Sequence, residues 1–192
     1  MSGRMPARDA LAAIHAARGE RDVVVTTMTP SRDWMTFPQH PLDVVMVPSA
    51  MGHATSIGLG LALAQPTRRV IVCNGDGSML MNLGSLVSIV DAKAENLVVV
   101  VFENGVYEVT GSEPIPASGG VDFAAMARAA GFRSTFEFSD ISKWQAAARQ
   151  VLTVPGPTFA ILRVDTQPGT PAPKSPGPAS ERGKKLIEAL RS

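Results

Sequence analysis

The feature of this sequence that most limits its possible folds is a run of six apolar residues, LVVVVF, at positions 97–102. An unbroken apolar run of this length is typical of a strand that is covered on both faces, as in a parallel sheet packed between helices. Similar apolar runs recur along the chain, and segments with helical spacing separate them. The sequence therefore predicts strands at 22–27, 43–47, 69–73, 97–102, 134–138 and 158–164.

Helical patterns fill the segments between these strands. They lie at 6–18, 52–65, 79–92, 121–130 and 140–152, and a short further helix is expected at 181–190. This alternation predicts the α/β class, with a doubly wound, six-stranded, mostly parallel sheet and helices on both of its faces. The helix at 52–65 (GHATSIGLGLALAQ) is rich in small residues, so we expect it to pack closely and to lie at an interface.

The expected domain organisation follows from where proline collects. Residues 167–179 (QPGTPAPKSPGPA) are rich in proline, which is excluded from the interiors of helices and sheets. We therefore expect one domain at 1–166, followed at 167–192 by a linker and a short C-terminal helix.

Composition argues against several classes of function. Lys and Arg total 18 against 17 for Asp and Glu, a net charge of +1, so no basic surface favours nucleic acid. No apolar run approaches the ~18 residues of a membrane span. No signal-peptide pattern opens the chain, so we expect a cytoplasmic protein without membrane contact. Cys73 is the single cysteine and lies in a predicted strand, where a buried, unreactive thiol is expected.

The strand predicted at 69–73 is followed by Asn-Gly-Asp-Gly-Ser at 74–78. Ligands of parallel sheets bind beyond the carboxyl ends of the strands, and glycines on both sides of Asp76 let the backbone approach a ligand closely. Ser78 is expected to be the N-cap of the next helix, whose free N–H groups suit a phosphate. Asp76 would repel a phosphate unless a divalent cation lay between them. The alternative is a plain Gly-Asp-Gly surface turn.

The strand predicted at 97–102 is followed by Glu-Asn-Gly-Val-Tyr at 103–107. In a parallel sheet, the end of this strand should lie beside the end of the strand at 69–73. The side-chain oxygen of Asn104 and the main-chain carbonyl of Val106 could then join Asp76 around one cation. Two phosphate oxygens and a water would complete an octahedral oxygen shell of the kind that Mg²⁺ prefers.

These residues and their spacing resemble the signature of thiamine-diphosphate-dependent enzymes. That signature is a Gly-Asp-Gly motif followed by an asparagine fewer than thirty residues on, and Asn104 stands 28 residues after Asp76. The resemblance implies thiamine diphosphate and Mg²⁺ as cofactors, and Asp76, Asn104 and the Val106 carbonyl as metal ligands. Asn104 to Tyr107 also fit the NxxY ending of decarboxylases in this family. The cofactor-binding residues that the resemblance implies are Ser49, Met51, Gly75, Asp76, Gly77, Ser78, Asn104, Val106 and Tyr107.

The segment Ser-Ala-Met-Gly-His at 49–53 agrees with this resemblance. In the family, a bulky apolar residue about 25 positions before the motif's aspartate props the cofactor in its V-shape, and Met51 stands at that position. The resemblance also implies that the Ser49 carbonyl and the Met51 N–H bind the aminopyrimidine edge. His53 could face the substrate as an acid/base group or an anion contact, or simply pack at a helix start. Met51 and His53 are thus the predicted catalytic residues.

Three further stretches resemble phosphonopyruvate decarboxylases and the β subunits of sulfopyruvate decarboxylases. They are TTMTPSRD at 26–33, MGHA at 51–54 and NGVYEVTG at 104–111. Met28 departs from the pattern, since those relatives often carry glycine there. The resemblance implies a small 2-oxo acid substrate with an anionic head, such as sulfopyruvate or phosphonopyruvate. Ser31 and Arg32 could bind that head, although a solvated loop arginine is the alternative.

Full-length members of the family also carry a pyrimidine-binding domain with an activating glutamate, and this sequence matches only the diphosphate-binding half. We therefore expect a carboxy-lyase subunit that is inactive alone and works with a separate, α-type pyrimidine-domain subunit in a homo- and hetero-oligomer. The alternatives are an acetolactate-synthase-like carboligase subunit and a non-catalytic thiamine-diphosphate-binding module.

Overall fold

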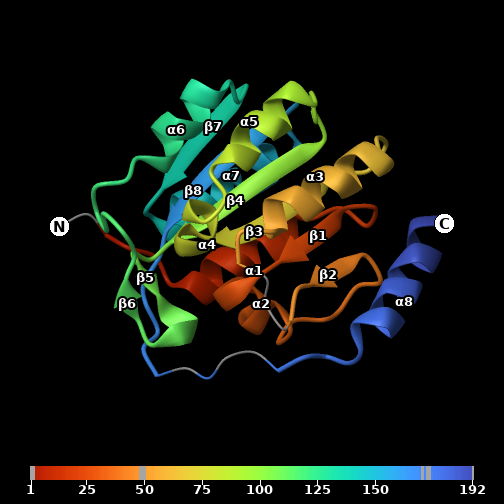
Figure 1. Cartoon of the computed structure of the whole chain (residues 1–192), viewed down its shortest axis with the longest axis horizontal. Coiled ribbons are helices and arrows are strands. Elements are labelled where there is room, and N and C mark those ends of the chain that lie inside the picture. The colour runs from red at the N-terminus through yellow and green to blue at the C-terminus, as the bar shows by residue number, and fades with distance from the viewer. Residues whose placement is uncertain (1–2, 48–50, 170, 172–173, 192) are drawn as a thin grey trace.

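The central feature of the fold is a parallel β-sheet, seen in the middle of Figure 1. The computed structural model describes residues 3–47, 51–169, 171 and 174–191, and within these residues the sheet has six strands in the order β2-β1-β3-β4-β8-β7. All neighbouring pairs in it are parallel. The strands are β1 (Val23–Thr26), β2 (Asp43–Val45), β3 (Val70–Gly75), β4 (Leu97–Glu103), β7 (Ser134–Phe138) and β8 (Thr158–Arg163). The predicted α/β class and doubly wound parallel sheet are therefore confirmed.

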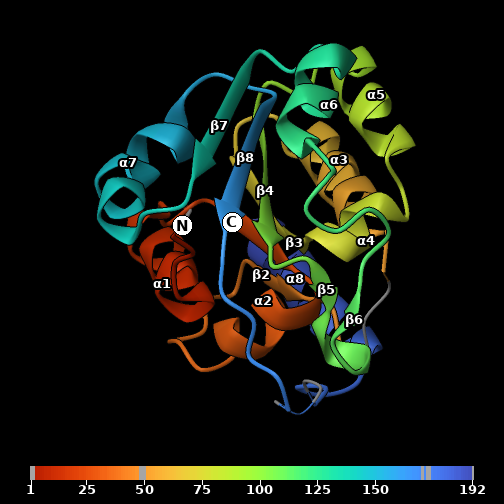
Figure 2. The same ribbon diagram turned by 90° about the vertical axis from the view of Figure 1, so that its left-hand side faces the viewer.

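Helices cover both faces of this sheet, as Figure 2 shows. One layer contains α3 (Ala54–Ala64), α4 (Asp76–Leu80), α5 (Gly84–Asp91) and α6 (Phe123–Ala130). The other layer contains α1 (Ala7–Ala17), α2 (Met28–Trp34) and α7 (Ile141–Thr153). A further helix, α8 (Ala179–Arg191), lies beside β2 (Figure 1).

Strand periodicity explains why both faces are covered. Val98 and Val100 lie in one hydrophobic core with α1 and α7, whereas Val99 and Val101 lie in another with α3, α5 and α6. Successive side chains of a strand point to opposite faces, so a strand made entirely of apolar residues is stable only between layers. The burial of β4 on both faces thus follows directly from its sequence.

The structure corrects the expected helices around the Gly-Asp-Gly motif. The helix predicted at 79–92 is two helices, because the chain turns between Leu80 and Gly84. The first of them, α4, already begins at Asp76, with Gly75 as its N-cap. Ser78 is therefore not the N-cap that we predicted.

Two other elements were not predicted. Helix α2 has Pro30 in its first turn, a position where proline is tolerated because the first-turn N–H groups have no helical partner. A small antiparallel pair, β5 (Val106–Tyr107) and β6 (Glu113–Pro114), flanks a 3₁₀ turn at Glu108–Thr110. Helix α2 follows β1, and the β5–β6 pair follows β4. Both elements therefore lie beyond the carboxyl edge of the parallel sheet.

The small-residue helix α3 packs closely on the sheet, as its composition indicates. A Cβ atom added to Gly58 would lie 2.2 Å from Cγ2 of Val72 in β3, so the helix backbone itself approaches the strand. Gly60 stands two residues further on in the same helix, and no described atom lies within 4 Å of the position a Cβ would take there.

This pair of glycines gives a matched prediction about stability. We expect Gly58→Ala to lower the free energy of unfolding by about 1–3 kcal/mol, because the added methyl overpacks the α3–β3 contact. Gly60→Ala should instead raise it by about 0.5–1 kcal/mol, because alanine favours a helix. Urea denaturation of both variants measures the difference. Equal stabilisation by both substitutions would contradict the close approach of α3 to β3.

The C-terminal helix α8 packs against β2, an edge strand of the sheet. Arg182 donates hydrogen bonds to the main-chain carbonyls of Val45 and, at 2.7 Å, of Val47. The helix predicted at 181–190 is thus present and begins two residues earlier. The division of the chain into a domain at 1–166 and a tail at 167–192 stays a prediction.

The lengths of the helices and the burial of Cys73 bear on two predictions made from composition. Within the described residues, no helix is long and apolar enough to cross a membrane. Cys73 is fully buried in β3, so the expected burial is confirmed, and this burial raises the pKa of its thiol above the ordinary value.

Candidate functional site

The candidate site is a pocket at the carboxyl ends of β1, β3 and β4. The neighbours of β1 in the sheet, β2 and β3, lie on its opposite sides, so the chain reverses its winding direction here. Open α/β sheets bind ligands at such a switch point. The pocket is lined by residues 28–30 and 33 after β1, 75–78 after β3, and 104 and 106–109 after β4, together with Ala7, Leu11, Met51, Phe102 and Val164.

Asp76 lies at the centre of this arrangement and is only 1% exposed. Its Oδ1 accepts a hydrogen bond from the N–H of Gly77 at 2.8 Å, and its Oδ2 accepts one from the N–H of Gly105 at 2.7 Å. Burial raises the pKa of Asp76 to about 6, although these two hydrogen bonds oppose the rise, and the charge of Glu103 adds to it. A buried carboxylate with a raised pKa is a candidate for ligand binding.

Asn104 lies at the end of β4, which pairs with β3 up to Gly75 and Phe102. The predicted adjacency of the two strand ends is therefore confirmed. The Asn104 Nδ2 donates to Glu108 at 2.8 Å, and its Oδ1 accepts from the N–H of Val106 at 3.0 Å. Between Asn104 and Val106, Gly105 adopts a φ of +82°, which glycine accommodates without strain, and this turn points its N–H at Asp76.

Tyr107 packs against the glycine-rich turn. A Cβ atom on Gly77 would lie 2.5 Å from the Tyr107 ring, so only glycine fits between the ring and the first turn of α4. At Gly75, by contrast, no described atom lies within 4 Å of the position a Cβ would take. Gly77 must therefore be glycine because Tyr107 packs against it, whereas Gly75 has open space beside it.

The donor set of this pocket suits a hard cation bound together with an anionic cofactor. Asp76 offers a carboxylate, Asn104 a side-chain carbonyl and Val106 a main-chain carbonyl, and oxygen ligands of these kinds are those that Mg²⁺ prefers. Among the described residues, no group of three or more His, Cys, Asp or Glu side chains is placed to hold a metal. A metal held here would therefore need oxygens from the bound cofactor as well.

Among the described residues that follow β2, some line the pocket and others do not. Met51 is half-buried and lines the pocket. The N–H of Gly52 donates to the Oγ of Ser78 at 3.0 Å, which ties this segment to α4. His53 is exposed at the start of α3, with Nδ1 2.9 Å from the Met51 carbonyl oxygen, and it is not among the described residues that line the pocket. Ser49 lies outside the described residues, and the roles of Ser49, Met51 and His53 stay predictions.

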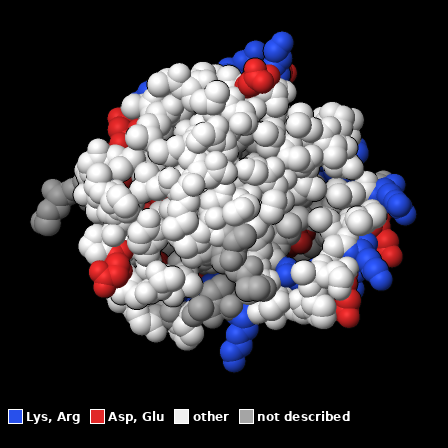
Figure 3. All heavy atoms as spheres, viewed as in Figure 1, with Lys and Arg blue, Asp and Glu red and all other residues white. Residues whose placement is uncertain are grey.

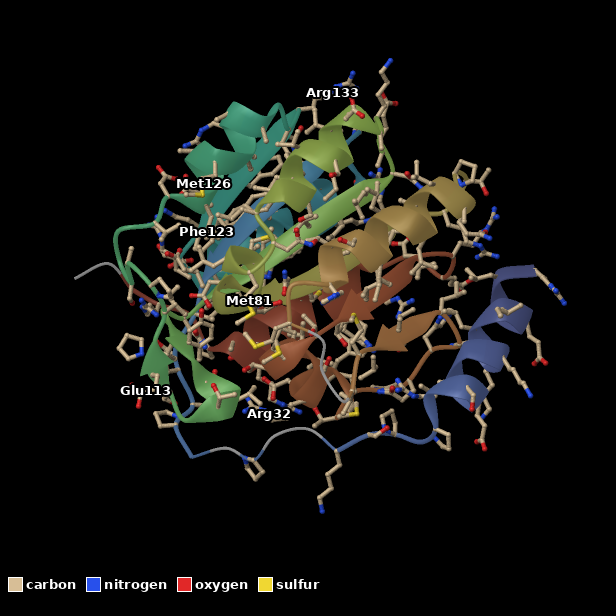
Figure 4. All side chains as sticks on the ribbon, viewed as in Figure 1. Arg32, Met81, Glu113, Phe123, Met126 and Arg133 are labelled. Carbon is tan, nitrogen blue, oxygen red and sulfur yellow. The ribbon has the colours of Figure 1, made fainter. Side chains whose placement is uncertain are left out.

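Arg32 is largely buried rather than solvated, and its role in binding the anionic head of the substrate stays a prediction. Its side chain is only 13% exposed, so it is not a solvated loop arginine. Its Nε donates to Asp33 at 2.9 Å, and one terminal nitrogen donates to the side chain of Gln167 at 3.0 Å. Arg32 belongs to α2 and lies below the sheet in Figure 4. Ser31 is buried, and its Oγ donates to Thr26 at 3.1 Å. Both side chains thus take part in contacts within the protein.

Glu108 is the residue of the pocket that the sequence interpretation missed. It is 8% exposed and receives hydrogen bonds from Thr29, Asn104 and the N–H of Gln167. Thr29 and Gln167 stand 79 and 59 residues away from it in the sequence, so no local pattern marks the cluster. The only signal in the sequence was its position four residues after Asn104, within the stretch NGVYEVTG.

Comparison with known proteins identifies the family. Residues 22–162 match the model of the thiamine pyrophosphate enzyme, C-terminal TPP binding domain. The chain is 41% identical to the sulfopyruvate decarboxylase subunit beta of Methanothermobacter thermautotrophicus, over 73% of this chain and 70% of that one. It is 38% identical to the phosphonopyruvate decarboxylase of Streptomyces viridochromogenes, over 77% of this chain but only 36% of that one.

A solved structure agrees on the fold. The thiamine diphosphate-dependent 4-hydroxybenzoylformate decarboxylase of Rhodococcus jostii superposes with a TM-score of 0.73 at 22% identity, over 87% of this chain and 34% of that one. The chain thus spans about a third of the larger enzymes that it resembles. With the family model covering most of the sequence, including both the Gly-Asp-Gly motif and Asn104, the chain belongs to the thiamine pyrophosphate enzyme family and contains its C-terminal, TPP-binding domain.

Proposed function

We propose that this chain is the thiamine-diphosphate- and Mg²⁺-binding subunit of a 2-oxo acid decarboxylase that acts on sulfopyruvate or phosphonopyruvate. The observation that carries the proposal is that Asp76 and Asn104 follow neighbouring strands at the carboxyl edge of the sheet. The N–H of Gly105, next to Asn104, donates a hydrogen bond to Asp76. The names of the relatives support the reaction and the substrate class, since they are sulfopyruvate and phosphonopyruvate decarboxylases.

In this proposal, the residues of the pocket divide the work of holding the cofactor. Asp76, Asn104 and the carbonyl of Val106 bind the metal, while the backbone of Gly75, Gly77 and Ser78 approaches the diphosphate. Tyr107, which packs on Gly77, fixes the turn between the two groups. Thiamine diphosphate, when bound, supplies the nucleophilic carbon that adds to the 2-oxo acid and the electron sink that allows CO₂ to leave. His53 is the predicted acid/base group or anion contact.

Met51 is proposed to hold the cofactor's two rings in their bent arrangement. We expect Met51→Ala to lower turnover by about 100-fold in the assembled enzyme, because misplacing a reacting group by roughly 1 Å has an effect of this size. The affinity for thiamine diphosphate should change little, since the metal and diphosphate contacts remain. Steady-state kinetics together with calorimetry separate the two quantities.

The control for this prediction is Ile187→Ala. Ile187 is an exposed apolar residue of α8, away from both the pocket and the α3–α6 layer. Both substitutions truncate a large apolar side chain to a methyl group, so turnover should fall only when Met51 is changed. A Met51→Ala enzyme as fast as the unmodified one would reduce this residue to ordinary packing.

The pyrimidine-binding half is proposed to come from a separate α-type subunit that covers the α3–α6 layer. The view of this layer in Figure 3 has few charged side chains away from its rim. Large apolar side chains are exposed on its helices, at Ile57 and Leu63 of α3, Val87 of α5 and Met126 of α6. An apolar surface with a charged rim is typical of a protein–protein interface.

Product analysis tests the reaction class directly. The assembled enzyme should release CO₂ and an aldehyde from sulfopyruvate or phosphonopyruvate as the sole substrate. A product that forms only when a second 2-oxo acid is present would favour the acetolactate-synthase-like carboligase. Tight binding of thiamine diphosphate without any turnover, with or without an α-type subunit, would favour a non-catalytic binding module.

A further inference from the structure

We propose that Glu108 is a positioning residue that orients the side-chain amide of Asn104, so that the oxygen of the amide, and not its nitrogen, faces the metal. This inference rests on the proposed function, because it takes Asn104 to be a metal ligand. It adds to that function a residue that lies beside the pocket's asparagine and determines which end of the amide meets the cation.

Glu108 is buried, and both oxygens of its side chain accept hydrogen bonds. Its Oε2 accepts hydrogen bonds from the Oγ1 of Thr29 at 3.2 Å and the Nδ2 of Asn104 at 2.8 Å. Its Oε1 accepts one from the N–H of Gln167 at 2.9 Å and lies 3.8 Å from a guanidinium nitrogen of Arg32. Among the described residues, each of these contacts comes from a donor or a cation, so the two oxygens of Glu108 act as acceptors.

The contacts of Glu108 restrict the asparagine beside it. The two ends of an amide are nearly equal in size, but only the oxygen can bind a cation, whereas the nitrogen carries two hydrogens. Both carboxylate oxygens of Glu108 accept hydrogen bonds, and Nδ2 of Asn104 is one of the donors. The reversed amide would turn its oxygen toward Oε2 of Glu108 and its nitrogen toward the N–H of Val106. Oδ1 therefore faces the other way, where it accepts from the N–H of Val106, the residue whose carbonyl is the third proposed metal ligand.

The position of Glu108 in the fold supports this role. The carboxylate joins the loop after β4, helix α2 after β1 and the segment after β8, so Asn104 is held against parts of the chain far from it in sequence. Arg32 lies between Glu108 and Asp33, which keeps a cation beside the carboxylate. Residues that orient a metal ligand in this way typically change metal affinity by ~10–100-fold when they are replaced.

The decisive experiment compares Glu108→Gln, Asn104→Asp and the double variant by calorimetric titration of Mg²⁺ in the presence of thiamine diphosphate. Glu108→Gln keeps the size of the side chain but adds an N–H₂ group, so only the N–H of Val106 still opposes the reversed orientation of Asn104, and we expect Mg²⁺ affinity to fall by about 10-fold. Asn104→Asp alone places two carboxylates in contact and should also weaken binding.

The double variant separates orientation from simple structural support. It restores one hydrogen bond with its direction reversed, because the glutamine at 108 donates to the aspartate at 104. The aspartate also has two equivalent oxygens, so it needs no orienting. We expect its Mg²⁺ affinity to recover to at least that of the unmodified chain. Asn104→Asp should thus lower the affinity of the unmodified chain and raise that of Glu108→Gln, whereas it would change both in the same direction if Glu108 only held Thr29, Arg32 and Gln167 together.

A second carboxylate of the same hairpin, Glu113, provides the control variant. Glu113→Gln removes a carboxylate from the same hairpin, where Glu113 is exposed and points away from the body of the protein in Figure 4, and it should bind Mg²⁺ as the unmodified chain does. Unchanged affinity in Glu108→Gln, or a double variant no better than Glu108→Gln, would overturn the inference. If Glu108→Gln does not fold, the affinity of the double variant decides alone. Unchanged affinity in Asn104→Ala would instead contradict the metal site itself, and with it the proposed function.

Discussion

Replacing Asp76 with alanine is expected to remove most of the Mg²⁺-dependent binding of thiamine diphosphate. The substitution takes away the charged ligand of the proposed site and leaves the anionic diphosphate facing an uncompensated pocket. Losing one partner of a buried charge pair typically costs about 2–5 kcal/mol of binding free energy. Calorimetry with and without Mg²⁺ measures the loss, and Asn104→Ala should act in the same direction but less strongly, since that side chain is neutral.

The matched control for this substitution is Asp91→Ala. Asp91 is an exposed carboxylate at the end of α5, so its removal should leave the binding of the cofactor unchanged. The two variants separate the loss of a site carboxylate from the loss of any negative charge. If Asp76→Ala bound thiamine diphosphate as tightly as the unmodified chain at saturating Mg²⁺, the metal site would have to lie elsewhere.

The pKa of Asp76 gives this prediction a pH dependence. Burial raises that pKa from its ordinary value of 3.8 to about 6, so the free protein holds a proton on Asp76 at pH 5 that Mg²⁺ must displace. Apparent Mg²⁺ affinity should therefore fall by about tenfold per pH unit below pH 6. The stability of the metal-free chain should change in the opposite direction. The contribution from protonated Asp76 is present below pH 3.8 and is lost as the pH rises through 6.

The second large effect is expected from the partner subunit. The purified chain, supplied with thiamine diphosphate, Mg²⁺ and sulfopyruvate or phosphonopyruvate, should release no CO₂ above the uncatalysed rate. Adding an α-type subunit should start the reaction, because the activating glutamate of the family lies on the pyrimidine-binding half. An acid–base group of this kind contributes about 10²–10⁴-fold to the rate.

The control for this experiment is an α-type subunit with glutamine in place of its activating glutamate. That subunit should still associate, since an obligate interface buries more than about 2,000 Å² and does not depend on one side chain. The rate should nevertheless stay near that of the chain alone. Full activity of the isolated chain would refute the proposed division between two subunits.

The parts of the fold that the sequence predicted well are those set by local apolar patterns. The run at 97–102 predicted β4, and parallel pairing then placed Asn104 near Asp76 without any knowledge of the structure. Helix α2 was missed because Pro30 conceals its first turn. The break between α4 and α5 was missed because apolar spacing continues across Leu80 to Gly84.

The candidate site was predictable only where its residues follow one another in sequence. The proposed metal-ligand set came from two short motifs, each at the end of a strand. The environment of Glu108 depends instead on Thr29 and Gln167, which tertiary packing brings together from opposite ends of the chain. The pairing of Arg32 with Asp33 and Gln167 was hidden for the same reason, and its suggested role in binding the anionic head of the substrate stays a prediction.

The contact between Arg182 and β2 limits how this protein can assemble. An open edge strand offers unpaired carbonyl groups, to which a strand from another chain can be added. Here the guanidinium group of Arg182 occupies the carbonyls of Val45 and Val47, and α8 lies alongside. A neighbouring chain therefore cannot extend the sheet at this edge without displacing α8. A chain cut short before α8 would leave these carbonyl groups open and would be prone to edge-to-edge aggregation.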